Sequence, residues 1–194
     1  DGASRSTLST FKWPDLWDSA EVVMMDDVTG EGIPEVALYG IHRRLGKGQL
    51  FVQDGSTASK LDVYNWNKLW NENQLLAMDD LDGEGSHDWG QFGQRKDDGR
   101  YQVVVKKGHS KKGAIRTFSW AANFDATTAT PLLLKDRTGD GVREIAIAGL
   151  DTSDGKMKLL INDGALANQR LYNVAWPANW DNGQIIELGD LNQD

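Results

Sequence analysis

The sequence has no cysteine, which excludes disulfide bonds and metal sites built on thiolates but does not exclude secretion. No apolar run is long enough to cross a bilayer, so we expect no membrane insertion. Positive charge is also scarce, because 21 Lys and Arg stand against 29 Asp and Glu and the net charge is −8. We therefore expect no nucleic-acid partner, since phosphate binding needs a basic surface, whereas a divalent cation suits an acidic chain.

Patterns that carry catalysis are missing as well. There is no Gly-x-Ser-x-Gly sequence and no phosphate-binding loop. The three histidines, His42, His87 and His109, do not repeat at a spacing typical of zinc sites, and we expect them at the surface. No unique residues break the repeat symmetry described below, as those of an active site would. We assign no catalytic residue and expect that the chain is not an enzyme.

A nine-residue acidic loop with the pattern D-x-[DTN]-G-[DE]-G-x-x-[DE] recurs along the chain. Its first aspartates lie 53, 56 and 54 residues apart. We number its positions 1 to 9 and call the complete copies loop 1 (27–35), loop 2 (80–88) and loop 3 (136–144). A fourth copy begins at 190 and stops at 194, and we expect the functional unit to continue beyond it.

Four short apolar runs accompany each loop in phase. They are rich in β-branched and aromatic residues, are bounded by Gly, Asp and Asn, and show no sustained helical period. This predicts an all-β fold of tandem, four-stranded antiparallel units resembling β-propeller blades, each of about 54 residues. We draw the repeats at 1–53, 54–106 and 107–162, with a partial repeat at 163–194, as one continuous domain of a longer array.

The acidic loop has the chemistry of a calcium site. Oxygens at positions 1, 3 and 5 can converge when the backbone curls, and glycines at positions 4 and 6 permit that curl. Position 7 offers a carbonyl, and the carboxylate at position 9 closes the far side. Such an irregular cage of oxygens suits Ca²⁺ better than Mg²⁺. The candidate ligands are Asp27, Thr29, Glu31, Ile33 and Glu35; Asp80, Asp82, Glu84, Ser86 and Asp88; Asp136, Thr138, Asp140, Val142 and Glu144; and Asp190, Asn192 and Asp194.

The copies are unequal. Loop 2 has four acids, and loops 2 and 3 are expected to be the best cages, because Glu31 is longer than the usual Asp at position 5. The alternative is that these segments are Asp-Gly turns between strands that need no metal. Four in-phase copies of alternating acids exceed what a turn requires.

Loop 3 and the following segment 144–149, Glu-Ile-Ala-Ile-Ala-Gly, resemble the FG-GAP/VCBS-type repeats of bacterial extracellular proteins and integrin-like propellers. The resemblance covers nearly the whole chain. It implies that Asp136, Thr138, Asp140, the Val142 carbonyl and Glu144 hold calcium, and that the protein is extracellular or on the cell surface. The chain departs from the family at position 5, which is Glu in two copies, and at position 3, which is Thr in two.

Aromatic residues also recur. The fourth run of each repeat ends in Trp, and a second aromatic follows four residues later. Periodicity favours packing for the first ring, and Trp89 is expected in the core. The second ring could equally bind carbohydrate by stacking, with Trp17, Trp70 and Trp180 as candidates. The basic stretch 106–112 is interpreted as a solvated turn, or as a contact for an acidic partner.

The leading hypothesis is a non-enzymatic, calcium-stabilised extracellular module, structural or adhesive, within a larger surface or filament-forming protein. Its expected partners are other copies or further repeats of the same protein, with a carbohydrate or cell-surface ligand as another candidate. The alternative is a carbohydrate-binding, lectin-like propeller that uses the repeated Trp residues. A polysaccharide-active enzyme is the third hypothesis.

Overall fold

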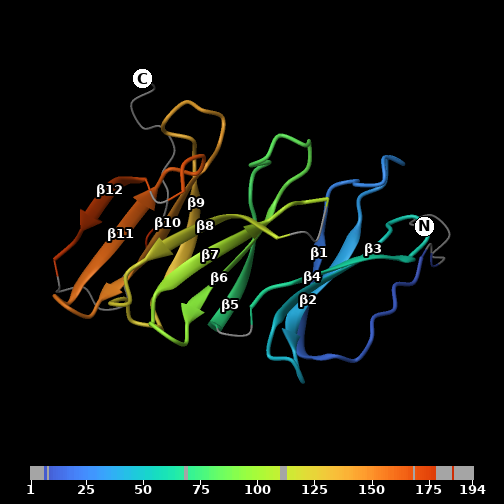
Figure 1. The fold of residues 1–194 in the computed structure, drawn as a ribbon, viewed down its shortest axis with the longest axis horizontal. Coiled ribbons are helices and arrows are strands. Elements are labelled where there is room, and N and C mark those ends of the chain that lie inside the picture. The colour runs from blue at the N-terminus through green and yellow to red at the C-terminus, as the bar shows by residue number, and fades with distance from the viewer. Residues whose placement is uncertain are drawn as a thin grey trace. The chain divides into compact units, whose positions relative to one another are not determined.

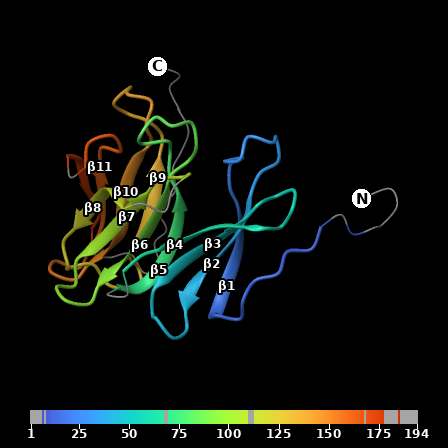
Figure 2. The same cartoon turned by 45° about the vertical axis from the view of Figure 1, so that its right-hand side comes forward.

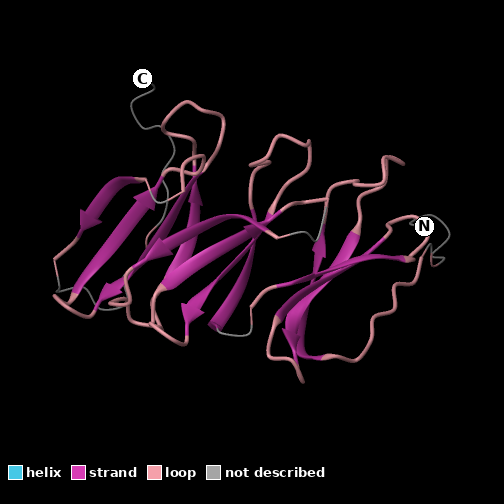
Figure 3. Cartoon of the chain, viewed as in Figure 1, coloured by secondary structure: helices cyan, strands magenta, loops and turns pink. Residues whose placement is uncertain are grey.

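A computed structural model describes residues 7, 9–67, 70–109, 113–167, 169–177 and 185. These residues form twelve strands joined by loops and turns (Figure 3). No helix capable of spanning a membrane occurs among them.

The strands form three antiparallel sheets of four consecutive strands each, and within each sheet the strands lie in sequence order (Figure 1). This confirms the all-β fold class of tandem, four-stranded, blade-like units. The first sheet contains β1 (Trp17–Met24), β2 (Val36–His42), β3 (Gly48–Gln53) and β4 (Lys60–Asn65). The second contains β5 (Trp70–Ala77), β6 (Trp89–Arg95), β7 (Tyr101–Lys106) and β8 (Ala114–Trp120). The third contains β9 (Thr130–Leu134), β10 (Glu144–Asp151), β11 (Lys156–Asn162) and β12 (Arg170–Ala175).

The sheets are offset by one strand from the sequence repeats. Strand β4 lies in 54–106, β8 in 107–162 and β12 in 163–194. The repeat boundaries were drawn at the turn between the third and fourth apolar runs, and in the structure this turn joins two strands of one sheet. Each sheet therefore combines three strands of one sequence repeat with the first strand of the next.

By contacts, the described residues divide into two compact units. One holds the residues up to Asp97 together with Gln102–Thr117, and the other holds Asp98–Tyr101 and the residues from Phe118 onward. The first sheet lies in the first unit, where the two-residue alternation of strands selects its core face. The pairs Ala37–Val52 and Tyr39–Leu50 bring apolar side chains of β2 and β3 together on that face. Figure 2 shows these two strands side by side in the first sheet.

The core of the first unit joins the first two sheets. Trp89 of β6 is buried in the same cluster as Tyr39, Tyr64 and Trp66 of the first sheet, which confirms the expected core position of Trp89. The second unit has its own core, formed by Leu134, Ala146, Ala148, Leu159 and Ile161.

The expectation that all histidines are exposed is wrong for His42. This side chain is buried at the end of β2, where its Nδ1 accepts hydrogen bonds from the backbone amides of Arg44 and Leu45 in the following turn. His87 and His109 are exposed, as expected.

Candidate metal centres at the acidic loops

Each acidic loop lies at the same end of its sheet as a second connection. Loop 1 joins β1 to β2, and the turn that begins at Asp54 joins β3 to β4. Because successive strands run antiparallel, both connections emerge at one end of the sheet. Loop 2 lies beside the turn that begins at Lys107, and loop 3 beside the turn that begins at Asp163. A turn residue can therefore join a cluster that the loop begins.

The loops curl as the sequence predicts. The glycines at positions 4 and 6 have φ angles between +78° and +93° in all three loops, a region that residues with a Cβ rarely adopt. These glycines are Gly30 and Gly32, Gly83 and Gly85, and Gly139 and Gly141.

The aspartate at position 1 organises each curled loop through backbone amides. Asp27 accepts hydrogen bonds from Gly30 at 2.7 Å and Gly32 at 2.5 Å. The corresponding distances are 2.8 and 2.6 Å at Asp80, and both are 2.7 Å at Asp136. The amide of the position 6 glycine is the main cause that lowers the pKa of each of these carboxyls. The partly exposed carboxylate at the first position is thus held ionised by the loop itself.

The carboxylate at position 9 is fully buried in all three loops, and it connects the loop to the neighbouring turn. One of its oxygens accepts the position 2 amide, and the other accepts the amide of a glycine 20 residues further along. For Glu35 these bonds come from the amides of Val28 at 3.3 Å and Gly55 at 2.8 Å, and the Thr29 amide donates as well at 3.3 Å. The same pair of bonds forms from Leu81 and Gly108 to Asp88, and from Arg137 and Gly164 to Glu144.

The glycine of the turn has no room for a side chain. A Cβ at Gly55 would lie 2.0 Å from the Pro34 carbonyl oxygen, and the matching distances are 2.1 Å at Gly108 and 2.0 Å at Gly164. Sequence reasoning missed the contact between these glycines and the loop. Their constant distance of 20 residues from position 9 was the available signal.

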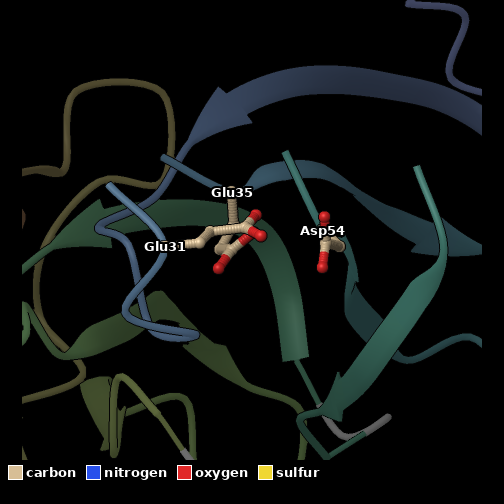
Figure 4. Close-up of side chains that lie close together, drawn as sticks. All are labelled: Glu31, Glu35 and Asp54. Carbon is tan, nitrogen blue, oxygen red and sulfur yellow. The ribbon is translucent and has the colours of Figure 1, made fainter. Parts of the chain in front are cut away.

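Carboxylates converge at two of the three loops. In loop 1, oxygens of Glu31 and Glu35 lie within 4.8 Å of each other and of Asp54 from the turn (Figure 4). The Thr57 amide and the Ser56 hydroxyl are the main causes that hold the pKa of Asp54 at about 2, so Asp54 carries its charge at neutral pH. In loop 2 the group comprises Asp80, Asp82 and Asp88. Within the described part of the chain, the acids of loop 3 form no such group.

Loop 2 also contains a cation supplied by the protein. The Lys107 ammonium lies 2.6 Å from an Asp82 oxygen and 3.4 Å from a Glu84 oxygen, and His109 contacts Glu84 as well. The interpretation of stretch 106–112 as a solvated turn is therefore wrong for Lys107, because Asp82 and Glu84 lie across the loop from it.

The remaining predicted ligands have other arrangements. Thr29 donates its hydroxyl to Asp27 and to Glu35, each at 3.1 Å, and Thr138 donates to Asp136 at 3.3 Å. Asp140 accepts the Val142 amide at 2.9 Å. Ile33 is exposed, and Ser86 is buried with no hydrogen-bond partner for its hydroxyl. Asp190, Asn192 and Asp194 lie outside the described residues.

The two described carbohydrate candidates are packed into their sheets. Trp17 and Trp70 begin β1 and β5 and are only 7% and 6% exposed. The Trp17 ring packs edge-on against Phe51, with 6.2 Å between ring centroids. Burial leaves little of either face for stacking on a sugar and favours the packing role. Trp180 lies outside the described residues.

The fold and these sites define a class: an all-β protein with three four-stranded antiparallel sheets in tandem and acidic clusters that could hold a metal ion. A scan against protein-family models finds no match, and neither does a search of curated proteins.

Proposed function

We propose that this chain is a calcium-stabilised extracellular repeat module of the FG-GAP/VCBS kind, with a structural or adhesive role rather than an enzymatic one. The observation that carries the proposal is the convergence of three carboxylates at loop 1, Glu31, Glu35 and Asp54. This cluster brings like charges together, and their mutual repulsion disfavours the folded state. A cation bound there offsets that repulsion.

The donor set fits calcium. The loop 1 cluster offers carboxylate oxygens, and Ca²⁺ accepts six to eight oxygens in flexible geometry.

Calcium would act by binding the folded form in preference to the unfolded chain. At a hundredfold excess over Kd, one site contributes about 2.7 kcal/mol of stability. For a chain of this length, that corresponds to a rise in Tm of roughly 5–10 °C for a site that unfolds with the whole protein. Extracellular modules bind calcium at about 10⁻⁴–10⁻³ M, so stabilisation at those concentrations would agree with an extracellular location.

The test is thermal melting in EGTA, followed by titration with Ca²⁺ and, separately, Mg²⁺. We expect Ca²⁺ to raise Tm and Mg²⁺ to raise it less. The double variant Glu31→Gln, Asp54→Asn should reduce the shift, whereas Glu21→Gln, an exposed acid on β1, should leave it unchanged. An identical Tm with and without Ca²⁺ would remove calcium from the proposal. Saturation below about 10⁻⁶ M would argue against tuning for the extracellular medium.

A further inference from the structure

The residue before the turn glycine differs among the three sheets. It is Asp54 beside loop 1 and Asp163 beside loop 3, but Lys107 beside loop 2. Position 3 of the loops varies with it: loops 1 and 3 have Thr there, and loop 2 has Asp82. The one loop that gains a carboxylate at position 3 thus has an ammonium in place of a carboxylate on the turn.

In the structure, the turn lysine and the aspartate at position 3 are in contact. Lys107 Nζ lies 2.6 Å from Asp82 Oδ2 and 3.4 Å from Glu84 Oε2, so the ammonium interacts with the carboxylates at positions 3 and 5. The side chains of Asp82 and Glu84 are only 16% and 19% exposed, which limits solvent screening of the interaction. In loop 1, by contrast, the turn residue Asp54 belongs to the carboxylate cluster.

We propose that Lys107 is a built-in counter-cation that makes loop 2 independent of metal. Its ammonium binds the carboxylate oxygens at positions 3 and 5 that a divalent cation would need, and a cation entering the loop must displace it and overcome its repulsion. Loop 1, whose turn contributes a carboxylate, is then the metal-responsive site of the first unit. This inference rests on the proposed calcium binding and reverses the order of the loops that acid counting predicts.

The matched variants exchange the turn residues. Lys107→Gln removes the charge, Lys107→Asp reproduces the turn of loops 1 and 3, and Lys107→Arg keeps the charge. Lys96→Gln and Lys96→Asp make the same changes at an exposed lysine in the turn between β6 and β7. Calcium binding to each purified chain is measured by isothermal titration calorimetry, and Tm is measured in EGTA and in Ca²⁺.

We expect Lys107→Gln and Lys107→Asp to add one calcium equivalent, or to strengthen one site by at least about tenfold, because the charge of the ligand set tunes affinity. Both variants should melt below the wild type in EGTA and gain more Tm from calcium. Adding Asp82→Asn to either should abolish the gain. Lys107→Arg and both Lys96 variants should behave like the wild type.

Two variants test the inference even if the Lys107 variants do not fold. With Lys107 in place, Asp82→Asn should leave calcium stoichiometry and affinity unchanged, whereas Asp54→Asn should weaken binding. Loss of a calcium site in Asp82→Asn, or unchanged affinity in a folded Lys107→Gln chain, would overturn the role of Lys107 while calcium binding stands. A wild type and Lys107→Asp that both fail to bind calcium would instead overturn the proposed function.

Discussion

Loops 1 and 2 have the same backbone curl but a different arrangement of charged side chains. Both place glycines of positive φ at positions 4 and 6, an amide-bonded aspartate at position 1 and a buried carboxylate at position 9. They differ at position 3 and at the turn residue. Loop 1 has Thr29 at position 3 and Asp54 on the turn, whereas loop 2 has Asp82 and Lys107. The shared positions build the loop, and the variable positions set the charge that it presents.

The comparison shows why counting acids is a poor guide to a metal site. Asp27 and Asp80 are bonded to their own loop amides, and Glu35 and Asp88 connect the loop to the turn. These carboxylates therefore stabilise the loop whether or not a metal binds. The two sites differ in the charged residue that the neighbouring turn contributes, Asp54 at loop 1 and Lys107 at loop 2.

The largest effect is expected at position 9 in both loops. Asp88→Ala leaves two amides without their acceptor and Glu35→Ala leaves three, each at a cost of about 3 kcal/mol in the free energy of unfolding. Urea denaturation in EGTA measures this without a contribution from metal. The control, Glu31→Ala, alters an exposed position 5 and should cost much less. A loss at Glu35 no larger than at Glu31 would contradict the structural role of position 9.

The next effect tests the turn glycines. Alanine at Gly55 or Gly108 would place its Cβ 2.0 or 2.1 Å from a loop carbonyl oxygen, so the turn must move away from the loop. We expect each substitution to lower the free energy of unfolding by about 2 kcal/mol, in the range of overpacked sites. Urea midpoints with and without Ca²⁺ make the measurement. Losses below about 0.5 kcal/mol would show that the two connections are not held in contact.

The sequence predicted the strands closely because the relevant signals are local. Short apolar runs rich in β-branched and aromatic residues, bounded by Gly, Asp and Asn, gave the four strands of each unit. The curl at Gly30 and Gly32 was also predictable, since only glycine adopts positive φ at low cost.

Which residues share a site was harder to predict from the sequence, because each site joins a loop and a turn that are far apart in the chain. Nothing near loop 1 in the sequence indicates that Asp54 joins Glu31 and Glu35, since that depends on which connections share one end of the sheet. Lys107 lies in a basic stretch typical of a solvated turn, and its partners become visible only when loop and turn are side by side. Four acids suggested that loop 2 was a strong cage, but the structure places a lysine there.

A smaller effect is expected on acidification, and it should be the same at position 1 of both loops. The pKa values of Asp27 and Asp80 lie below the ordinary value of 3.8, so their contribution to stability is present above about pH 4 and is lost as the pH falls through the lowered pKa. The pKa of Asp88 is raised, so its contribution has the opposite sign: it is present below pH 3.8 and is lost as the pH rises through the raised value.

Urea midpoints from pH 7 to pH 3 in EGTA test these signs. The wild type should lose stability below about pH 4, and Asp27→Asn or Asp80→Asn should flatten this acid limb. Glu21→Gln is the control and should keep the slope of the wild type. An acid limb unchanged in both Asn variants would show that the loop amides do not favour the ionised aspartates.

The smallest effect concerns the link between the two loops. His87, at position 8 of loop 2, donates its backbone amide at 2.6 Å to Asp26, the residue before loop 1, and its ring contacts the same carboxylate at 2.7 Å. Burial raises the pKa of Asp26, but the bonds from His87 outweigh it and the net shift is downward. His87→Ala removes only the ring contact between exposed groups and should cost about 0.5 kcal/mol, whereas Asp26→Ala removes both bonds and should cost about 1 kcal/mol.

A double-mutant cycle on His87 and Asp26 isolates the contribution of the ring. We expect a coupling of about 0.5 kcal/mol at low salt that shrinks as ionic strength rises, because both side chains are partly exposed. A cycle without coupling would show that the ring contact adds nothing to the bond from the His87 backbone amide. If coupling is present, the coupling energy can be measured with and without calcium, because Asp26 precedes loop 1 and His87 belongs to loop 2. A coupling energy that changes when calcium binds loop 1 would then show that loop 2 responds to a cation it does not itself bind.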